Sequence, residues 1–578
     1  MPEISGSGVV SYISNFSYVS EQSFVIMRER LLAGFDKIWI DCMNGDSRQT
    51  GKRTPSGDPD PSVFSTDYNR EGIKKGTAVC VLVRHRDHAA EGEFAAVRYR
   101  DFWGAHKREL LEQSLGEKDL DAQYATAHPV KADRHSFRPA ELHDRYHSWP
   151  KLIDMCSFAR NGLMEKRGGA LIDMDRESLL ERMRAYYDQA TDWKEWTSAG
   201  FGLSKDASGF VAEKVRGKVQ KAGEFNLDRA VRYAVRPFDT QWAYYSDVSP
   251  LWNRSRPELF HQVWNGNMFL ISRQKGAANP EGVPFSFCKV LGDDHYVRDD
   301  AYFIPFWLKT PPQNESQQEE MFKRPPPPQT AKANVSELTR QYLISLGFDD
   351  PDGLPDVACL PWLHALAVGF APQYVHFHDE VLRTDWPRIP LPATIDILEQ
   401  SAALGHQVAL LLDTEAAVSG GSSGTIREDL KGIAQLAKKK PNGDFGAQIT
   451  PASDLRLSAG WGRVQNDGVI MPGPGRMEEV ADPGAWGGML NVYLNDAVCW
   501  RNVPVEVWEF TIGGYQVIKK WLSYREHGTS DRPILGRPLT SAEARYVREV
   551  ARRLSAIVLL QEELDVNYEA VIANTWQP

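Results

Sequence analysis

Four histidines lie close together in this sequence, and their side chains suit metal chemistry. They are His128, His135, His143 and His147. On a helix, His143 and His147 would share one face with Asp144 beside them, a spacing that can chelate a divalent metal. No glutamate follows the first histidine as zinc peptidases require. We therefore expect a solvated surface and no metal, and a metal-dependent hydrolase is the less favoured interpretation.

A second group of side chains suits the binding of phosphate. Residues 201–275 hold 12 Lys and Arg against 7 Asp and Glu, in a chain whose formal net charge is −10. A basic surface on an acidic protein is what contact with a DNA backbone requires, because each neutralised phosphate releases counterions. Such runs also occur on ordinary solvated surfaces. Charge alone leaves both interpretations open.

Aromatic residues are dense in the same part of the chain. The run from 233 to 269 contains Tyr233, Trp242, Tyr244, Tyr245, Trp252 and Trp264. Such rings can stack on bases or sugars, but they more often form the core beneath a sheet. We expect an aromatic sheet core.

The first eighty residues are expected to form alternating strands and helix. Three apolar, β-branched runs predict strands, at 8–15, 37–42 and 77–83. The segment 20–34 predicts a helix, with Ser20 as its N-cap and Gly34 at its end. Only seven residues precede the first strand, so no glycine-rich nucleotide loop comes before it. We therefore expect half of an enzyme domain, with an open strand edge at 8–15.

The composition is that of a large protein of the cytoplasm. With 578 residues, of which 42% are hydrophobic, the chain is long enough for several domains. Its six cysteines include no CxxC pair, which favours a reducing compartment and argues against a zinc ribbon. We find no targeting segment and no apolar run near the roughly 20 residues that span a bilayer. We expect a soluble, cytoplasmic protein with no membrane partner.

Two polar segments divide the rest of the chain. Residues 309–335 contain four consecutive prolines and predict a linker, and residues 414–427 predict a flexible loop. A helix is expected at 177–187, and a long helix is expected from the capping box of Thr540 and Glu543. Three parts are predicted: an α/β segment at 1–95, a helical connector at 96–200 and a mixed α+β region at 201–578.

Short motifs along most of the chain resemble one family in the same order. They are VVSYISN at 9–15, FVIMR at 24–28, FDKIWIDCMNGD at 35–46, TGK at 50–52, DPDPSVFSTDYNREGIKKGTAVCVLVR at 58–84, YRDFWG at 99–104, VRPFDTQWAYY at 235–245, RPELFHQVW at 256–264, WPRIPLP at 386–392, NVYLNDAVCWRN at 491–502 and IGGYQVIKKWL at 512–522. Together they are similar to the end of the adenine methyltransferase domain and the target-recognition domain of type ISP restriction-modification enzymes.

This resemblance implies a fold and a function. Residues 1–95 would be the carboxyl-terminal half of a Rossmann-like α/β methyltransferase sheet, followed by the helical connector and a mixed α+β target-recognition region. The implied function is sequence-specific recognition of double-stranded DNA for adenine methylation in restriction-modification, and hence in phage defence. The alternative is a non-catalytic specificity subunit that guides a separate methyltransferase or nuclease.

The catalytic half is expected outside this sequence. S-adenosylmethionine would serve the complete enzyme, and we do not expect it to bind this chain alone. Neither an NPPY-type tetrapeptide nor a Walker GKS or GKT motif occurs. The methyltransferase, translocase and nuclease portions would come from a missing amino-terminal part or from a partner subunit. A split gene, a truncated reading frame and a fragment all fit.

The resemblance also implies site residues. Related amino-methyltransferases stack an aromatic ring on the extruded base, and Phe64, before the strand at 77–83, best matches that position. A core role for Phe64 is the equal alternative. Asp239 is expected to hold Arg236 or Arg232 by a bidentate pair. The residues expected to contact DNA are Arg232, Arg236, Arg254, Arg256, Lys218 and Lys221.

Overall fold

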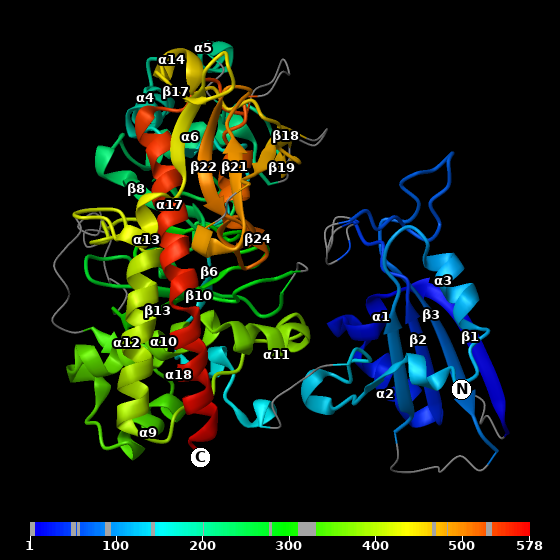
Figure 1. The fold of residues 1–578 in the computed structure, drawn as a ribbon. Helices are drawn as coiled ribbons and strands as arrows, with labels where there is room; N and C mark the ends of the chain where they lie inside the picture. Colours follow the sequence, from blue (N-terminus) through cyan, green and yellow to red (C-terminus); the bar gives the residue numbers. More distant parts are fainter. Residues whose placement is uncertain are drawn as a thin grey trace. The chain divides into compact units, whose positions relative to one another are not determined.

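The computed structural model describes most of the chain (Figure 1). It covers residues 6–577 except 48–51, 53, 55–57, 87–93, 140–144, 200–201, 208, 277–279, 310–330, 465–469, 482–483 and 528–533. Most of the predicted linker 309–335 lies outside these described residues. The chain divides into two compact units. Unit 1 comprises Met1–Lys151, Gln274–Pro284 and Gln373–Arg388, and unit 2 comprises Leu152–Arg273, Phe285–Pro372 and Ile389–Pro578.

A mixed five-stranded sheet forms the centre of unit 1. Its strands are β1 (Gly8–Asn15), β2 (Lys37–Cys42), β3 (Thr77–Arg84), β4 (Ala96–Asp101) and β5 (Ala125–Ala127). They lie in the order β1-β3-β2-β4-β5, in which β2 and β4 are parallel and the other neighbours are antiparallel. The three predicted strands are confirmed, but the sheet has fewer parallel neighbours than an alternating α/β pattern suggests.

The helix between β1 and β2 begins later than predicted. The regular helix α2 runs over Val25–Gly34, after α1 (Ser17–Ser20) and one 3-10 turn. Ser20 is therefore not its N-cap, and no side chain caps α2. The guanidinium of Arg28 is buried and donates 2.9 Å to the main-chain oxygen of Glu21. A tertiary contact thus supports this helix where the sequence suggested a local cap.

Strand β1 lies at the edge of the sheet and is exposed along most of its length. Val9, Val10 and Ile13 are 67%, 48% and 53% exposed. The strand pairs with β3 on one side, and no described strand pairs with its other side. The expectation of an open edge at 8–15 is confirmed. Exposed apolar side chains on an unpaired edge strand are unusual, because such an edge invites another strand to pair with it.

The segment 96–200 is not a helical connector. It begins with β4 and then contains α3 (Lys107–Ser114), β5 and several 3-10 turns. Its part up to Lys151 belongs to unit 1, because β4 and β5 complete the sheet beside β2. The later part contains two helices, of which α4 (Arg176–Tyr187) is the predicted one and α5 (Trp193–Ala199) follows it.

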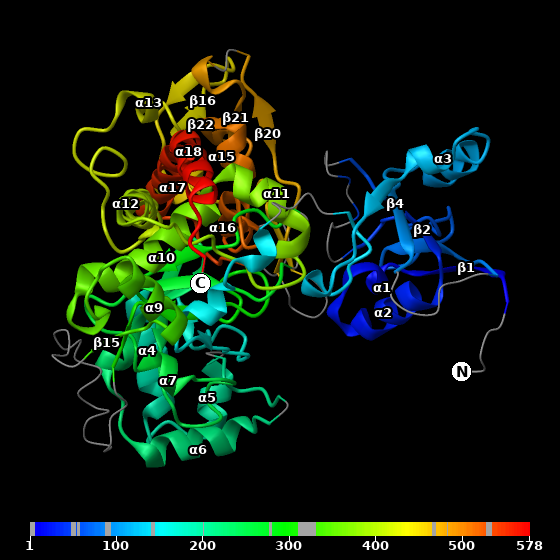
Figure 2. The same ribbon diagram turned by 90° about the horizontal axis from the view of Figure 1, so that it is seen from below.

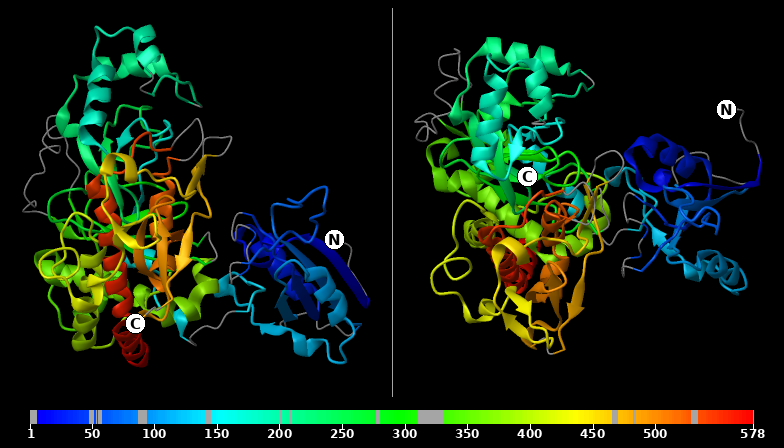
Figure 3. Two further views of the ribbon diagram at one scale, coloured as in Figure 1. Left: turned by 45° about the horizontal axis from the view of Figure 1, so that its top comes forward. Right: turned by 90° about the horizontal axis from the view of Figure 1, so that it is seen from above.

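Two four-stranded sheets form the first part of unit 2, in the orders β12-β8-β9-β7 and β11-β10-β13-β6. Their strands are β6 (Arg160–Asn161), β7 (Ile172–Asp173), β8 (Ala230–Arg236), β9 (Asp239–Tyr244), β10 (Phe269–Ser272), β11 (Ser286–Cys288), β12 (Leu291–Gly292) and β13 (Tyr302–Pro305). Helices α5 and α6 (Ala212–Ala222) lie at one end of the unit (Figures 2 and 3). Tyr233, Tyr244, Tyr245 and Trp252 are buried in one apolar cluster beneath these elements, so the expectation of an aromatic core is confirmed.

Long helices run through the second part of unit 2. They are α9 (Glu337–Ser345), α10 (Pro355–Phe370), α12 (Ile395–Leu412), α17 (Ser541–Leu559) and α18 (Gln561–Ala573), while α11 (Pro372–Leu382) lies almost wholly in unit 1. α10 and α12 approach closely at Gly405, where an added Cβ atom would lie 1.8 Å from the main-chain oxygen of Leu363. α17 starts at the predicted capping box of Thr540 and Glu543. None of the described helices has the length and apolar character needed to cross a membrane.

A third sheet of unit 2 packs one face against α17. Its strands are β16 (Gln435–Lys439), β17 (Phe445–Ala447), β20 (Met477–Glu479), β21 (Met489–Tyr493) and β22 (Val498–Pro504), in the order β17-β16-β22-β21-β20. Trp500 of β22 is fully buried and donates its indole N–H to the main-chain oxygen of Ala544 on α17.

The shorter elements of unit 2 are α7 (Pro257–Phe260), β14 (Trp307–Leu308), β15 (Lys332–Ala333), α13 (Glu428–Lys431), α14 (Pro451–Asp454), β18 (Gly462–Val464), β19 (Ile470–Pro472), α15 (Val505–Glu509), β23 (Thr511–Ile512), β24 (Tyr515–Gln516) and α16 (Val517–Ser523).

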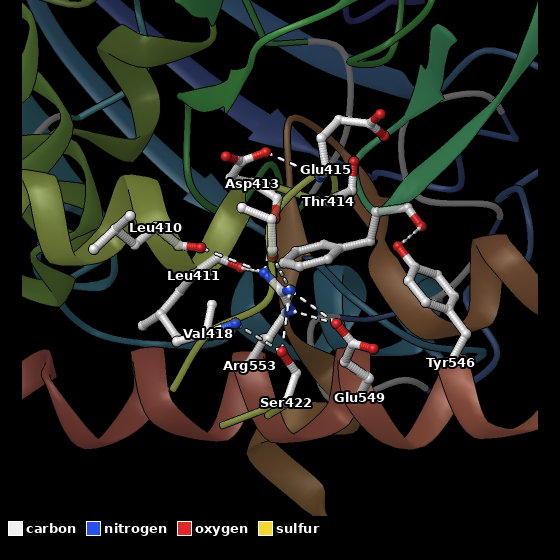
Figure 4. Close-up of polar contacts among 12 residues, drawn as sticks. Leu410, Leu411, Asp413, Thr414, Glu415, Val418, Ser422, Tyr546, Glu549 and Arg553 are labelled. Atoms are coloured by element: carbon white, nitrogen blue, oxygen red, sulfur yellow. Dashed lines mark hydrogen bonds and ion pairs between the residues drawn. The ribbon is translucent and has the colours of Figure 1, made fainter. Parts of the chain in front are cut away.

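The loop 414–427, predicted to be flexible, is held by a buried arginine (Figure 4). Arg553 on α17 is 2% exposed and donates to the main-chain oxygen of Asp413 and to the hydroxyl of Ser422. Glu549, one turn earlier on the helix, accepts from the same guanidinium at 2.8 Å. One side chain thus satisfies several acceptors of the loop and gives it a defined path.

A buried ion pair connects the β8–β9 turn to the carboxyl-terminal helices of unit 2. The side chains of Asp239 and Arg525 are 1% and 5% exposed, and the guanidinium donates to both carboxylate oxygens at 2.7 and 3.0 Å. The same guanidinium lies 3.8 Å from the ring centre of Trp521. Tyr546 of α17 donates its hydroxyl to the main-chain oxygen of Phe238, a contact also drawn in Figure 4. These contacts join strands and helices that are almost 300 residues apart in sequence.

Replacing Asp239 by alanine is expected to lower the free energy of unfolding by about 3–5 kcal/mol, because the Arg525 guanidinium would stay buried without its carboxylate. Urea unfolding followed by tryptophan fluorescence measures this decrease. An Asp239→Leu, Arg525→Met double variant should be destabilised much less. Glu428→Ala, which removes an exposed partner of Lys431, is the control and should change little. A decrease for Asp239→Ala as small as that of the control would contradict the structural role of the pair.

Candidate nucleic-acid interface

A long loop between β2 and β3 carries Phe64, the residue expected to stack on an extruded base. Its side chain is 44% exposed. The same loop has an open hollow of about 530 Å³, and the residues that line it are Pro61, Ser65, Thr66, Asp67 and Arg70. Stacking on a base needs an accessible ring, and Phe64 meets this requirement. The stacking role itself stays a prediction.

A buried ion pair anchors this loop to the sheet. The ammonium of Lys107, on α3, lies 2.7 Å from the carboxylate of Asp60, and their side chains are 2% and 0% exposed. Asp60 also accepts the main-chain N–H groups of Gly45 and Gly104 at 2.7 and 2.8 Å, and Lys107 donates 2.6 Å to the main-chain oxygen of Met43. Burial lowers the pKa of Lys107, and the hydrogen bond to Asp60 opposes that shift. A buried pair is tolerated when its remaining bonding capacity is satisfied in this way.

The Arg-Pro-Phe-Asp turn of unit 2 is a structural element. The prediction that Asp239 pairs with Arg236 or Arg232 is wrong, because Asp239 is already held by the arginine that follows α16. The Arg236 guanidinium lies 3.1 Å from the carboxylate of Asp293 and donates 3.1 Å to the hydroxyl of Tyr524. Its side chain is only 13% exposed. Arg236 therefore does not lie on an open surface.

Arg232 also has protein partners. Its guanidinium donates 2.9 and 2.8 Å to the carboxylate of Glu415 and lies 5.0 Å from the ring centre of Trp242. The side chains of Arg232 and Glu415 are 23% and 25% exposed. Because a fork of this kind satisfies the guanidinium within the protein, the structure gives no support to a DNA contact at Arg232.

One side of α6 carries basic residues that face solvent. Lys214, Lys218 and Lys221 are exposed, while the opposite side of the helix is buried in the core of unit 2. Among the described residues, no carboxylate forms an ion pair with any of these three ammonium groups, and Lys218 donates to the main-chain oxygen of Ser249. The sequence prediction included Lys218 and Lys221 but missed Lys214, which the helical spacing of four and three residues places on the same face.

Arg254 and Arg256 flank the turn before α7. Arg254 is exposed, and its main chain exchanges two hydrogen bonds of 3.0 Å with Met164. Arg256 is half-buried, with a φ of 47° at the N-cap of α7, and its Nε has no hydrogen-bond partner among the described residues. Of the two, Arg254 is the more accessible to DNA.

The histidines do not assemble a metal site in the part of the chain that the structure describes. No group of three or more His, Cys, Asp or Glu side chains there is placed to hold a metal ion. His143 and Asp144 lie outside the described residues. His135 is buried and His147 half-buried, and burial lowers the pKa of each imidazole. The expected solvated surface is therefore wrong for these two histidines, which pack inside unit 1.

The family described as the Type ISP C-terminal specificity domain matches residues 154–550. The chain belongs to this family. The match lies mostly in unit 2 and includes α6, the Arg-Pro-Phe-Asp turn and Arg525. The resemblance of the motifs to the C-terminal part of Type ISP enzymes is thereby confirmed.

Three solved structures have a similar fold. They are the ATP-dependent Type ISP restriction-modification enzyme LlaBIII bound to DNA (TM-score 0.58, 13% identity, 98% of this chain and 33% of that chain), a nuclease-deletion mutant of the Type ISP enzyme LlaGI in complex with a DNA substrate mimic (0.56, 13%, 97% and 46%) and a DrdV–DNA complex (0.58, 17%, 99% and 51%). At such low sequence identity the structural similarity shows a shared fold alone, and the chain spans a third to about half of each protein. A search of the curated proteins found no match.

Replacing Phe64 by alanine should cost little stability, because a ring that is 44% exposed gains only part of the roughly 1.5–3 kcal/mol of full burial. Phe16→Ala is the matched control. Phe16 is 5% exposed and packs against Gly76, so its truncation should cost about 3–5 kcal/mol. Both values come from urea unfolding of the full chain. A destabilisation at Phe64 equal to that at Phe16 would assign Phe64 to the core and remove the stacking role.

Proposed function

We propose that this specificity-domain chain binds double-stranded DNA through unit 2 and recognises its sequence as part of a restriction-modification enzyme. The observation that carries the proposal is the family match over residues 154–550, in a chain whose fold is similar to three structures solved with DNA or a DNA mimic. We place this function in the cytoplasm and in defence against phage.

The exposed face of α6 supports a role in backbone contact. Its three lysines are free of described carboxylates, so no ion pair has to break before a phosphate binds. Gly217 lies among them, and no atom lies within 4 Å of the position that its Cβ would occupy. A glycine within a helix costs roughly 1 kcal/mol relative to alanine, and here it permits close approach of a ligand. Arg254 supplies a further exposed cation of unit 2.

We further propose that unit 1 is the carboxyl-terminal half of an adenine methyltransferase domain, and that recognition serves adenine methylation. The open edge of β1, with its exposed valines and isoleucine, supports this because another strand can pair there. The accessible ring of Phe64 on an anchored loop is consistent with base stacking. S-adenosylmethionine would then be held by sequence outside this chain or by a partner subunit.

A non-catalytic specificity subunit is the second candidate. It is favoured by one observation, that the family match begins at residue 154 and leaves nearly all of unit 1 outside. In that case unit 1 would bind another protein and would have no part in methyl transfer.

Neutralising the α6 face should weaken DNA binding. A Lys218→Ala, Lys221→Ala variant is expected to lower the slope of log affinity against log salt by roughly 0.9 for each phosphate that the protein no longer neutralises, with the fold unchanged. Fluorescence anisotropy with a labelled duplex measures both affinity and slope. The charge-matched control is Lys332→Ala, Lys431→Ala, which removes two exposed lysines elsewhere in unit 2. Equal slopes for the two double variants would show that α6 is only a solvated surface.

Isothermal titration of the full chain with S-adenosylmethionine should give no tight binding, because β1 has an open edge where the cofactor-binding half is expected. Micromolar binding would contradict this assignment of unit 1.

The stacking role of Phe64 can be tested once the catalytic portion is added. Phe64→Ala should then reduce methylation by the equivalent of about 1–3 kcal/mol.

A further inference from the structure

Two of the motifs that resemble the family meet in unit 2 around a pair of tyrosines. Arg236 comes from the motif at 235–245, and Lys520 from the motif at 512–522. The Arg236 guanidinium lies 5.3 and 5.7 Å from the ring centres of Tyr515 and Tyr524, and the Lys520 ammonium lies 5.1 and 4.4 Å from the same centres. Two cations that share both rings are close neighbours, and like charges repel unless an anion lies between them.

Lys520 has no anionic partner in the described part of the chain. The residue is 8% exposed, and no described oxygen lies within hydrogen-bond or ion-pair distance of its ammonium. Two carboxylates of this region are engaged elsewhere, since both oxygens of Asp239 accept from an arginine and Asp293 pairs with Arg236. A largely buried ammonium without a counter-charge is costly, so an anion at the exposed part of Lys520 would stabilise its charged form.

Further donors surround the two cations. The Nε of Arg236 is buried and has no hydrogen-bond partner among the described residues. The hydroxyl of Tyr524 accepts a hydrogen bond from Arg236, which leaves its own proton available to donate. Arg298, whose main-chain N–H donates 2.8 Å to Gly513 at the tip of the β23–β24 hairpin, is a further positive charge close enough to lower the pKa of Lys520. Ammonium, guanidinium and hydroxyl donors with an excess of positive charge suit a phosphate.

We propose that Arg236 and Lys520 hold one backbone phosphate of bound duplex DNA. The inference rests on the DNA-binding function proposed above and assigns it a contact apart from the lysines of α6. The site is not sealed, because Lys520 and Arg236 keep 8% and 13% of their surface and both tyrosines are half-buried. One phosphate oxygen at this opening would supply the missing counter-charge.

The affinity of the site for phosphate should depend on pH through the charge state of Lys520. Burial, followed by the positive charges of Arg236 and Arg298, lowers the pKa of Lys520 to about 7, and Asp239 opposes the shift. Besides these groups, Asp293 and the two tyrosines face the site, and the carboxylate of Asp299 acts on Tyr515. A bound phosphate favours the protonated amine, so its contribution to affinity is complete below pH 7 and declines as the pH rises above that value.

The same pKa predicts how the free protein responds to pH. Between about pH 7 and the ordinary lysine value of 10.5, the unfolded chain binds more protons at this residue than the folded chain. The contribution of Lys520 to the free energy of unfolding therefore rises with pH across this window. Below pH 7 the buried charge destabilises the fold, and removing it should stabilise the free protein.

The experiment compares the full-length chain with Lys520→Met, Lys520→Arg and the exposed-surface control Lys431→Met. Anisotropy with a labelled duplex is measured against salt below pH 7 and then against pH. Lys520→Met should bind about tenfold more weakly at about 0.1 M salt, with a log–log slope smaller by roughly one unit. Urea unfolding should show that the same variant is more stable below pH 7 without DNA. Lys520→Arg should bind like the parent without the decline in affinity above pH 7, which can reach about tenfold per pH unit.

The outcomes separate this phosphate site from DNA binding in general. Parent-like affinity and slope for Lys520→Met, with normal binding by the control, would overturn the phosphate site and leave DNA binding intact. If the parent chain binds no duplex, the proposed DNA-binding function is contradicted. Thermal melts with inorganic phosphate then test whether the site binds phosphate at all. Stabilisation of the parent by phosphate, absent in Lys520→Met, would identify a site for a free phosphate compound and overturn its assignment to DNA.

Discussion

The arrangement of unit 2 depends on the buried pair of Asp239 and Arg525. Neither charge is tolerable alone at 1% and 5% exposure, so the β8–β9 turn and the segment after α16 must come together or both stay solvated. Once they are together, Arg236 and Lys520 are neighbours, because each lies within five residues of one member of the pair. A structural ion pair thus brings together cations from two distant motifs, and Lys520 among them has no anionic partner in the described part of the chain.

Unit 1 also contains a buried ion pair, and this pair positions a loop. Lys107 and Asp60 are buried together and bond to the main chain at the start of the β2–β3 loop and at Gly104 after β4, so that the loop is positioned although much of it is polar. Phe64 can then remain exposed without the loop collapsing over it. In both units the most deeply buried charged side chains are the structural ones, and the candidate ligand-binding residues lie beside them.

The sequence predicted the elements that depend on local patterns. Alternating apolar residues located β1, β2 and β3, and the capping box of Thr540 and Glu543 located α17, because these signals act within a few residues. Partners distant in sequence were missed. Nothing near Asp239 indicates that Arg525, 286 positions later, takes its carboxylate, or that Arg553 orders the loop 414–427. For the same reason the sequence named Arg236 as a DNA contact but gave no sign that Lys520, 284 positions later, lies beside the same two tyrosine rings.

The central claim is that unit 2 presents its basic residues to DNA, and chemical footprinting of lysines tests it most directly. The full chain would be acetylated briefly with and without duplex DNA, and the modification of each lysine would be quantified by mass spectrometry. We predict that DNA protects Lys214, Lys218 and Lys221 on α6 and leaves the exposed Lys431 unchanged. Equal modification of all four lysines with and without DNA, under conditions where the duplex is bound, would contradict the account.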